Sequence, residues 1–106
     1  ANIMNTVGKV ARDWKKKVIF TEIGFPSLAA SWQEPHAESG ERIASSEDQA
    51  RCYRAMIRAL KGREWCDGVY LWKWGAFQER RRELNRGFTP RSKPAQALIE
   101  EWFDGI

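Results

Sequence analysis

The chain has 106 residues, the size of one small domain, and a hydrophobic fraction of 42% that can build a core, so its composition excludes a largely disordered chain. Its formal charge of +4 comes from a lysine run at 15–17 and an arginine run at 80–82, which fall in expected connections and indicate solvated loop charge rather than a nucleic-acid surface. No apolar run approaches the ~20 residues that cross a membrane, and the amino end has no basic region before an apolar stretch, so we expect neither a membrane span nor a signal peptide.

The cysteine and histidine content indicates no metal site and no disulfide framework. Cys52 falls in an expected helix and Cys66 at the start of an expected strand, so we expect them to pack as small apolar groups. His36 cannot complete a metal site with two separated cysteines, and no zinc-type spacing occurs in the sequence. We therefore expect no metal and no cofactor.

The first third of the chain predicts a helix, a strand and a long loop. Apolar residues recur at helical spacing over 3–14, namely Ile3, Val7, Val10, Ala11 and Trp14. An unbroken β-branched and aromatic run then predicts a buried strand over 18–22, which Gly24 and Pro26 end. The segment 27–45 is expected to be a loop, and loops of this length are uncommon unless they serve a site or are disordered.

The middle of the chain predicts a second helix and a second strand. Ser46 is expected to cap the helix in a capping box, with Gln49 three residues later. The helix should run to about Leu60, where Gly62 ends it. A second strand is expected over 69–74.

A second loop, 75–91, leads to a last helix that begins near Pro94, because Pro is favoured in the first helical turn. The expected apolar face of this helix consists of Ala95, Leu98, Ile99 and Trp102. The order helix, strand, helix, strand, helix describes a βαβ unit with flanking helices, so the two strands should be parallel. Two such strands leave two open edges and little core, and an eight-stranded barrel normally needs ~250 residues. We therefore expect residues 1–106 to be one partial domain of the α/β class, the last quarter of a larger unit.

The strongest candidate functional residue is Glu22, which ends the first strand. The carboxyl ends of strands are where α/β folds place catalytic groups, and an acid is costly to bury without a function. Position alone leaves two interpretations open: a catalytic carboxylate, or a strand-end acid that points to solvent or pairs with an arginine.

Four segments occur in a fixed order along the chain: TEIGFPS at 21–27, GVYLWKW at 68–74, GFTP at 87–90 and KPA at 93–95. In this order they resemble the carboxyl-terminal part of clan A glycoside hydrolases. The nearest likeness is to family 113, the β-mannanase-like enzymes, and to related glycoside hydrolase TIM-barrel proteins, and it covers most of the chain.

The resemblance implies a (β/α)₈ TIM barrel, of which this chain would be the carboxyl-terminal βαβα portion, with strand seven at 18–22 and strand eight at 69–74. It implies that Glu22 is the nucleophile of a retaining mechanism. It also implies that Trp72 forms the floor of a sugar subsite, because a flat apolar sugar face packs well on an indole ring.

Alternation along the second strand would place Tyr70, Trp72 and Trp74 on one face, with Val69, Leu71 and Lys73 on the other. If the first face points into the barrel, Trp72 and Trp74 reach the same mouth as Glu22. Lys73 then faces outward, or contacts the neighbourhood of Glu22 only through a loop. The alternative is that both tryptophans pack between strand and helices. Trp32, in the loop after the first strand, would either line a more distant sugar subsite or cover apolar surface.

The chain departs from the family in one essential feature. The family's acid/base Glu lies on strand four, and nothing in this sequence matches it; three loop acids, Glu34, Glu38 and Glu41, are poor substitutes. We therefore expect the isolated chain to be inactive.

Three hypotheses about function remain open. The first is a fragment of a retaining glycoside hydrolase acting on β-linked, mannan-like polysaccharide or oligosaccharide. The second is a non-catalytic carbohydrate-binding or structural TIM-barrel relative, and the third is a small basic adaptor that associates through its strand edges. The expected partners are a carbohydrate substrate and either the missing remainder of the barrel or further copies of the chain. The sequence leaves the localisation open, with a secreted or periplasmic protein among the possibilities.

Overall fold

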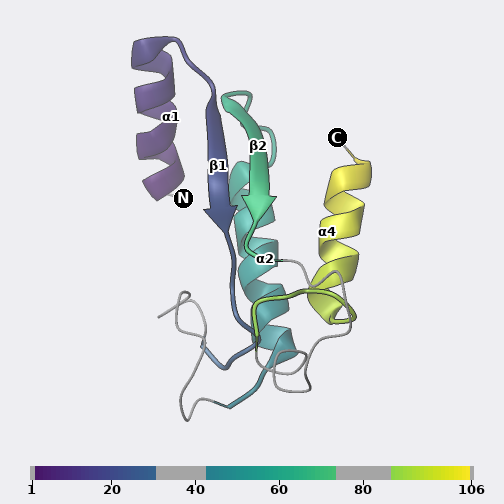
Figure 1. Ribbon diagram of the computed structural model, residues 1–106. Helices are drawn as coiled ribbons and strands as arrows, with labels where there is room; N and C mark the ends of the chain where they lie inside the picture. Colours follow the sequence, from purple (N-terminus) through teal and green to yellow (C-terminus); the bar gives the residue numbers. More distant parts are fainter. Residues whose placement is uncertain (1, 31–42, 74–86, 106) are drawn as a thin grey trace.

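The computed structural model describes residues 2–30, 43–73 and 87–105 (Figure 1). The element order is α1 (Asn2–Trp14), β1 (Val18–Ile23), α2 (Ser46–Leu60), β2 (Cys66–Leu71) and α4 (Pro94–Asp104). The expected elements are all present and the α/β class is confirmed. Several predicted residues lie outside the described residues, namely Trp32, Glu34, His36, Glu38, Glu41, Trp74 and the arginines at 80–82.

The two strands are parallel, as predicted, and pair directly in the order β1-β2, side by side in Figure 1. The expected range of the second strand, 69–74, was wrong, because β2 begins three residues earlier and ends at Leu71. Pairing with β1 explains the earlier start of β2: Val18 lies opposite Cys66, and the Val18 N–H donates to the Trp65 carbonyl at 2.7 Å. The β propensity of residues 66–68 does not reveal these contacts, because they depend on a strand far away in the sequence.

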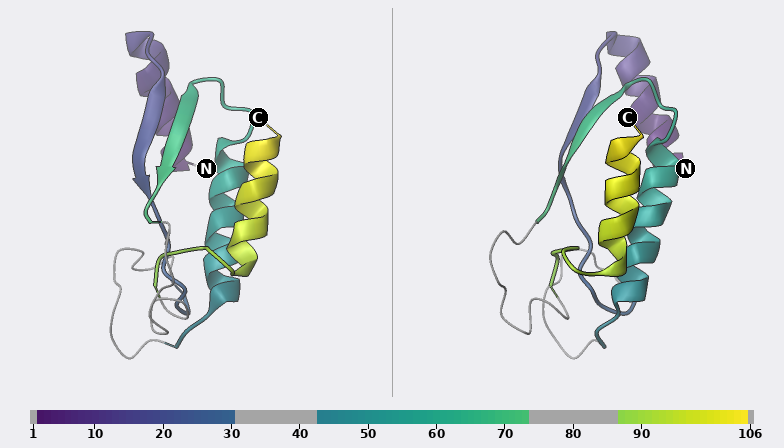
Figure 2. Two further views of the ribbon diagram at one scale, coloured as in Figure 1. Left: turned by 45° about the vertical axis from the view of Figure 1, so that its right-hand side comes forward. Right: turned by 90° about the vertical axis from the view of Figure 1, so that its right-hand side faces the viewer.

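The core lies between the paired helices α2 and α4 and one face of the sheet (Figure 2). Its buried residues are Ala50, Tyr53, Met56, Leu60, Ala95 and Ile99. Phe20 and Ile23 of β1 and Val69 and Leu71 of β2 pack against this cluster. The apolar face predicted for the last helix is confirmed, since Leu98 and Trp102 also pack there.

The cap of α2 differs from the prediction by one residue. Ser45, in an extended conformation with φ −154° and ψ 97°, is the N-cap, and its hydroxyl accepts a hydrogen bond from the Asp48 N–H at 3.1 Å. Ser46 is already the first helical residue. Two adjacent serines make the position of the cap ambiguous from sequence, and the extended backbone of Ser45 decides it.

Helix α1 begins one residue before its predicted start and ends at the predicted residue, but it does not bury its apolar stripe. Ala11 is buried, whereas Ile3, Val10 and Trp14 are 76%, 53% and 73% exposed. The helix instead approaches the fold through Gly8, where an added Cβ would lie 2.7 Å from Trp65 Nε1. Much of the apolar surface of α1 is therefore not covered by any described residue.

The two cysteines do not form a disulfide; Cys52 is buried in α2 and Cys66 is half-buried at the start of β2. No helix in the described parts of the chain is long and apolar enough to cross a membrane.

Candidate active site

Glu22 lies on a bulge of β1. Between Phe20 and Ile23 the chain advances three residues, while the paired strand advances two, from Val69 to Leu71. Strict alternation would put Glu22 on the same face as Phe20, toward the helices. The extra residue changes this: Phe20 and Ile23 both pack on the core, and Thr21 and Glu22 between them are both exposed. The bulge therefore turns the Glu22 carboxylate to the face of the sheet away from α2 and α4, which we term the open face.

No described residue forms a hydrogen bond or ion pair with the Glu22 side chain. The ion pairs in the described part of the chain join Lys9 to Asp13 and Arg51 to Asp48. In the second interpretation left open by position, pairing with an arginine finds no support among these residues, whereas an acid that points to solvent agrees with the exposure of Glu22. Exposure alone therefore leaves both a catalytic and a solvent-facing carboxylate open.

Trp72 lies directly beside the end of β1. Its N–H donates to the Ile23 carbonyl at 2.6 Å, so the strand pairing extends one residue past β2. Trp72 is 45% exposed and Tyr70 is 65% exposed, whereas Val69 and Leu71 pack on the core, so the predicted alternation of these four residues is confirmed. Trp72 is thus not core packing between strand and helices, and it shares the open face with the Glu22 carboxylate.

Lys73 follows Trp72 and is exposed. Its ammonium lies 5.8 Å from the centroid of the Trp72 ring, within the range of a cation–π contact. The peptide bond between the two residues is cis. The Lys73 ammonium therefore lies beside the indole ring of Trp72.

Gly24 allows the two strand ends to approach. A Cβ added at this position would lie 1.8 Å from the carbonyl oxygen of Trp72, 2.9 Å from its carbonyl carbon and 3.1 Å from Cδ1 of Phe88. No other residue fits this contact without moving backbone. The sequence pattern marked Gly24 only as the end of a strand, and the neighbouring strand reveals that Gly24 lies against the Trp72 carbonyl.

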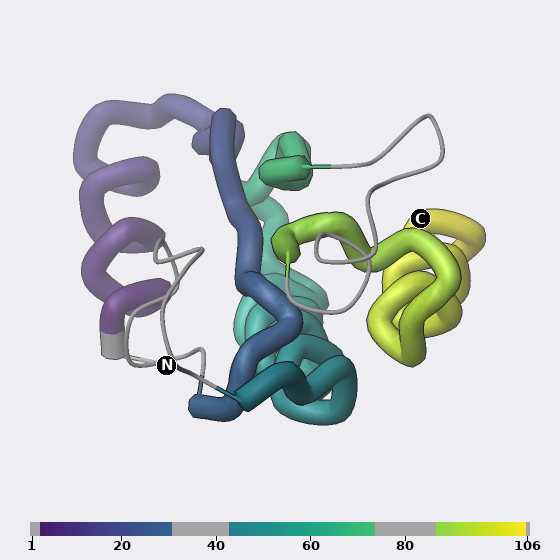
Figure 3. The backbone as a smooth tube through the Cα atoms, turned by 60° about the horizontal axis from the view of Figure 1, so that its bottom comes forward, coloured from purple at the N-terminus to yellow at the C-terminus, as the bar shows by residue number. Residues whose placement is uncertain are grey.

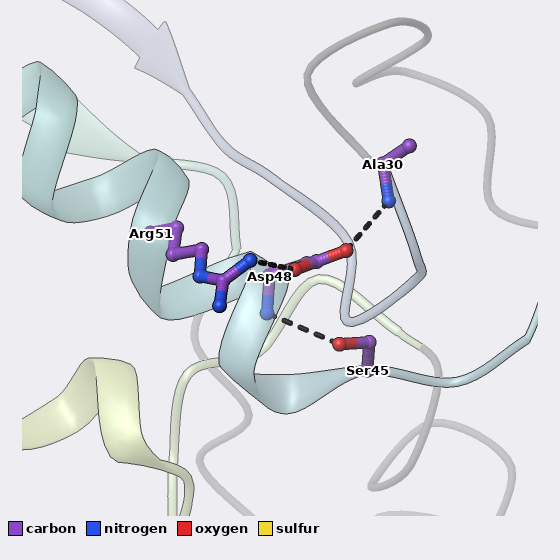
Figure 4. Close-up of polar contacts among 4 residues, drawn as sticks. All are labelled: Ala30, Ser45, Asp48 and Arg51. Carbon is purple, nitrogen blue, oxygen red and sulfur yellow. Dashed lines mark hydrogen bonds and ion pairs between the residues drawn. The ribbon is translucent and has the colours of Figure 1, made fainter.

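The first turn of α2 holds the loop that follows β1. The Asp48 carboxylate accepts the Ala30 N–H at 2.8 Å and the Arg51 guanidinium at 3.3 Å, while the Asp48 N–H binds Ser45 (Figure 4). Ala30 has a φ of 53°, a left-handed conformation that this contact helps to hold. The loop is therefore tied to a rigid element near the site.

Residues 87–93 run from beside the segment that follows β1 to the start of α4 (Figure 3). The Ser27 N–H donates to the Gly87 carbonyl at 2.9 Å, and Lys93 Nζ donates to the same oxygen at 3.3 Å. Two segments far apart in sequence thus meet shortly after the end of β1.

Among the described residues, no group of three His, Cys, Asp or Glu side chains could hold a metal ion. Burial raises the pKa of Tyr53, in the core beside Phe25, to about 12.

The candidate site thus combines the exposed carboxylate of Glu22 with the half-exposed indole of Trp72 at neighbouring strand ends. This combination suits nucleophilic attack on a ligand that stacks on an apolar ring.

A family model for Glycoside Hydrolase Family 113 matches residues 1–93. The chain belongs to this family. The resemblance indicated by the sequence motifs is therefore confirmed. A comparison with curated proteins finds no match.

Solved structures of family 113 show the same fold. The chain is similar to the GH113 β-mannanase AaManA from Alicyclobacillus acidocaldarius in complex with ManMIm, with a TM-score of 0.87 and 25% identity over 98% of this chain. It is also similar to two structures of a GH113 β-1,4-mannanase, with TM-scores of 0.85 and 0.86 and identities of 24% and 23% over 97% of this chain. The match covers 34% of each of the solved chains. The family 113 chain thus spans about a third of the structures it matches, and the predicted fold, a portion of a TIM barrel, is confirmed.

Proposed function

We propose that residues 1–106 form the strand-seven and strand-eight part of a retaining glycoside hydrolase that acts on β-linked, mannan-like polysaccharide or oligosaccharide, with Glu22 as its nucleophile. The observation that carries this proposal is the bulge in β1, which turns Glu22 away from the core and onto the face that Trp72 shares. Membership of family 113 supports the reaction class, and the β-mannanase names of the solved relatives support the substrate class.

In this mechanism the Glu22 carboxylate attacks the anomeric carbon, the glycosidic oxygen leaves, and a covalent glycosyl-enzyme forms. A second carboxylic acid protonates the leaving oxygen and then takes a proton from the water that releases the sugar. In retaining enzymes the two carboxyl groups stand ~5–5.5 Å apart. We propose that this acid/base comes from polypeptide outside residues 1–106, so that the isolated chain is inactive.

The tryptophans would bind the sugar. Trp72 presents a half-exposed indole beside Glu22, a surface that suits the apolar face of a pyranose ring. Trp74 and Trp32 lie outside the described residues, and we propose them as further aromatic contacts to the substrate on the basis of the sequence motifs.

Uncovered apolar surface supports the remainder of a barrel as the partner. The open face carries Ile19 and Tyr70, 51% and 65% exposed, and the stripe of α1 is similarly uncovered. A groove of about 1090 Å³, lined by Val69 of β2 and by Leu98 and Trp102 of α4 among others, lies beside the strand pair. In a parallel sheet such surfaces are normally buried on both faces by further strands and helices. The solved relatives, of which this chain spans a third, are long enough to supply them.

The test uses the polypeptide that joins residues 1–106 to the preceding strands of the barrel, termed the complete barrel. Glu22→Gln should lower kcat for a β-mannan oligosaccharide by about 10³-fold or more, since it removes the nucleophile and keeps the size of the side chain. Glu64→Gln is the matched control: Glu64 is also exposed but lies in the turn before β2, at the other end of the strand from Trp72, and its loss should leave kcat unchanged.

A second measurement identifies the nucleophile directly. A 2-deoxy-2-fluoro mannoside with a good leaving group should label the complete barrel on the peptide that contains Glu22, and the product of the normal substrate should keep its anomeric configuration. Label on another carboxylate, inverted product, or full turnover by the Glu22→Gln variant would contradict the proposal. Binding of mannan without any turnover would favour the non-catalytic relative instead.

A further inference from the structure

Gln49 makes an unusual set of contacts for a residue in a helix. It is fully buried in the first turns of α2, with an exposed fraction of 0%. Its Nε2 lies 3.1 Å from the carbonyl oxygen of Phe25, 3.1 Å from that of Phe88 and 3.3 Å from that of Thr89. The sequence pattern predicted a capping-box role for Gln49, but its side chain crosses to two other segments of the chain.

The chemistry of the amide explains why a glutamine occupies this position. Three carbonyl oxygens converge on the Gln49 amide nitrogen, and this nitrogen has two hydrogens to donate to them. The Oε1 atom of Gln49 has no hydrogen-bond partner in the described residues, so the side chain binds these segments through its donor end. A buried carbonyl that loses its donor costs roughly 1–3 kcal/mol, so each of these contacts matters to the local geometry.

The segments that Gln49 holds are the ones that flank the Glu22 site. Phe25 follows Glu22 by three residues, and Gly24 between them lies against the Trp72 carbonyl. Phe88 lies on the other side, with its ring beside the same glycine. Gln49 therefore binds carbonyls of the two segments that meet at the contact between Gly24 and Trp72, two residues after Glu22.

We propose that Gln49 is a positioning residue for the nucleophile: by holding the Phe25 and Phe88 carbonyls it fixes the backbone that carries Glu22 relative to Trp72. This rests on the proposed function of Glu22. The neighbouring Asp48 does the complementary task for a more distant part of the loop, since its carboxylate accepts the Ala30 N–H. The first turns of α2 thus place the Gln49 amide donor near the segment that carries Glu22 and the Asp48 carboxylate acceptor further along the same loop.

The test is Gln49→Met in the complete barrel, because Met has similar length and volume but no donor. At a temperature well below the unfolding midpoint of each variant, kcat for an aryl β-mannoside should fall about 10- to 100-fold while KM changes less than about threefold, since a displacement of about 1 Å at a reacting group costs on the order of 10²-fold. Gln49→Asn keeps both donors but is one methylene shorter, and its kcat should lie between those of Gln49→Met and the unchanged protein.

The matched control is Gln96→Met, the same substitution in the first turn of α4, where Gln96 binds Ser92 and Glu100. Its kcat and KM should be unchanged. If Gln49→Met lowers the unfolding midpoint but keeps kcat within twofold, or if neither Gln49 variant folds, the residue is only structural and the inference is overturned.

Failure of this inference is distinguishable from failure of the proposed function. An inactive Glu22→Gln variant together with a Gln49→Met variant of normal kcat would overturn only the role of Gln49. Full turnover by Glu22→Gln would overturn both.

Discussion

Replacing Gly24 with alanine should disrupt the junction between the two strands. The new Cβ would lie 1.8 Å from the Trp72 carbonyl oxygen, and the atoms that must give way belong to backbone rather than to a flexible side chain. Forcing strand ends apart costs about 1–3 kcal/mol, as overpacking does in a core. It would also break the 2.6 Å hydrogen bond from the Trp72 N–H to the Ile23 carbonyl, which adds about 0.5–1.5 kcal/mol.

The expected loss for Gly24→Ala is therefore about 2–4 kcal/mol in the free energy of unfolding, measured by urea titration of the complete barrel. Because Glu22 lies two residues away, kcat should fall as well. Gly105→Ala is the matched control: its Cβ would lie 3.5 Å from the nearest atom, an ordinary contact, and its effect should stay within about 0.5 kcal/mol. A loss below about 0.5 kcal/mol for Gly24→Ala would refute the argument that the close approach requires glycine.

Four further predictions concern the N-cap of α2, the buried Tyr53, the exposed Trp72 and the isolated chain. Ser45→Ala should cost about 1 kcal/mol in the free energy of unfolding and Ser46→Ala less than half of that, because only Ser45 caps α2; equal losses in urea titrations would contradict this assignment. Because burial raises the pKa of Tyr53 from 10.0 to about 12, its neutral form is favoured in the folded protein; the associated stability is fully present below pH 10 and is lost between pH 10 and 12, by roughly 2–3 kcal/mol. The stability difference between the unchanged protein and Tyr53→Phe should fall over this range, and a flat difference would argue against it. Trp72→Ala in the complete barrel should raise KM about 5- to 10-fold in steady-state assays, and an unchanged KM would remove Trp72 from the sugar site. Residues 1–106 alone should form oligomers through their strand edges in light scattering, and a cooperatively unfolding monomer would count against this.

Local patterns in the sequence were enough to predict the elements and their order. Apolar spacing located α1 and α4, the run from Val18 located β1, and alternation assigned Tyr70 and Trp72 to the face opposite Val69 and Leu71. These features depend on residues within a few positions of one another, where helix and strand periods are directly readable. The start of β2 was missed because it depends on pairing with β1 rather than on propensity.

The site was predictable in position but not in orientation. The end of β1 identified Glu22, yet strict alternation from Phe20 would have directed it into the core. A bulge leaves no clear mark in a single strand, because it is defined by the count of residues on two strands at once. The structure thus supplied the property on which the proposed role of Glu22 depends, the exposure of its side chain at the end of β1.

The sequence by itself determined the family of this chain, the α/β order of its elements and the carboxylate that ends its first strand. Only the tertiary structure decided which way that carboxylate faces, why Gly24 must be glycine and what Gln49 holds. The physical reason is the range of the interactions: caps, turns and periodicity act between neighbours in sequence, whereas the bulge, the close approach and the shared amide join segments that meet only when the chain has folded.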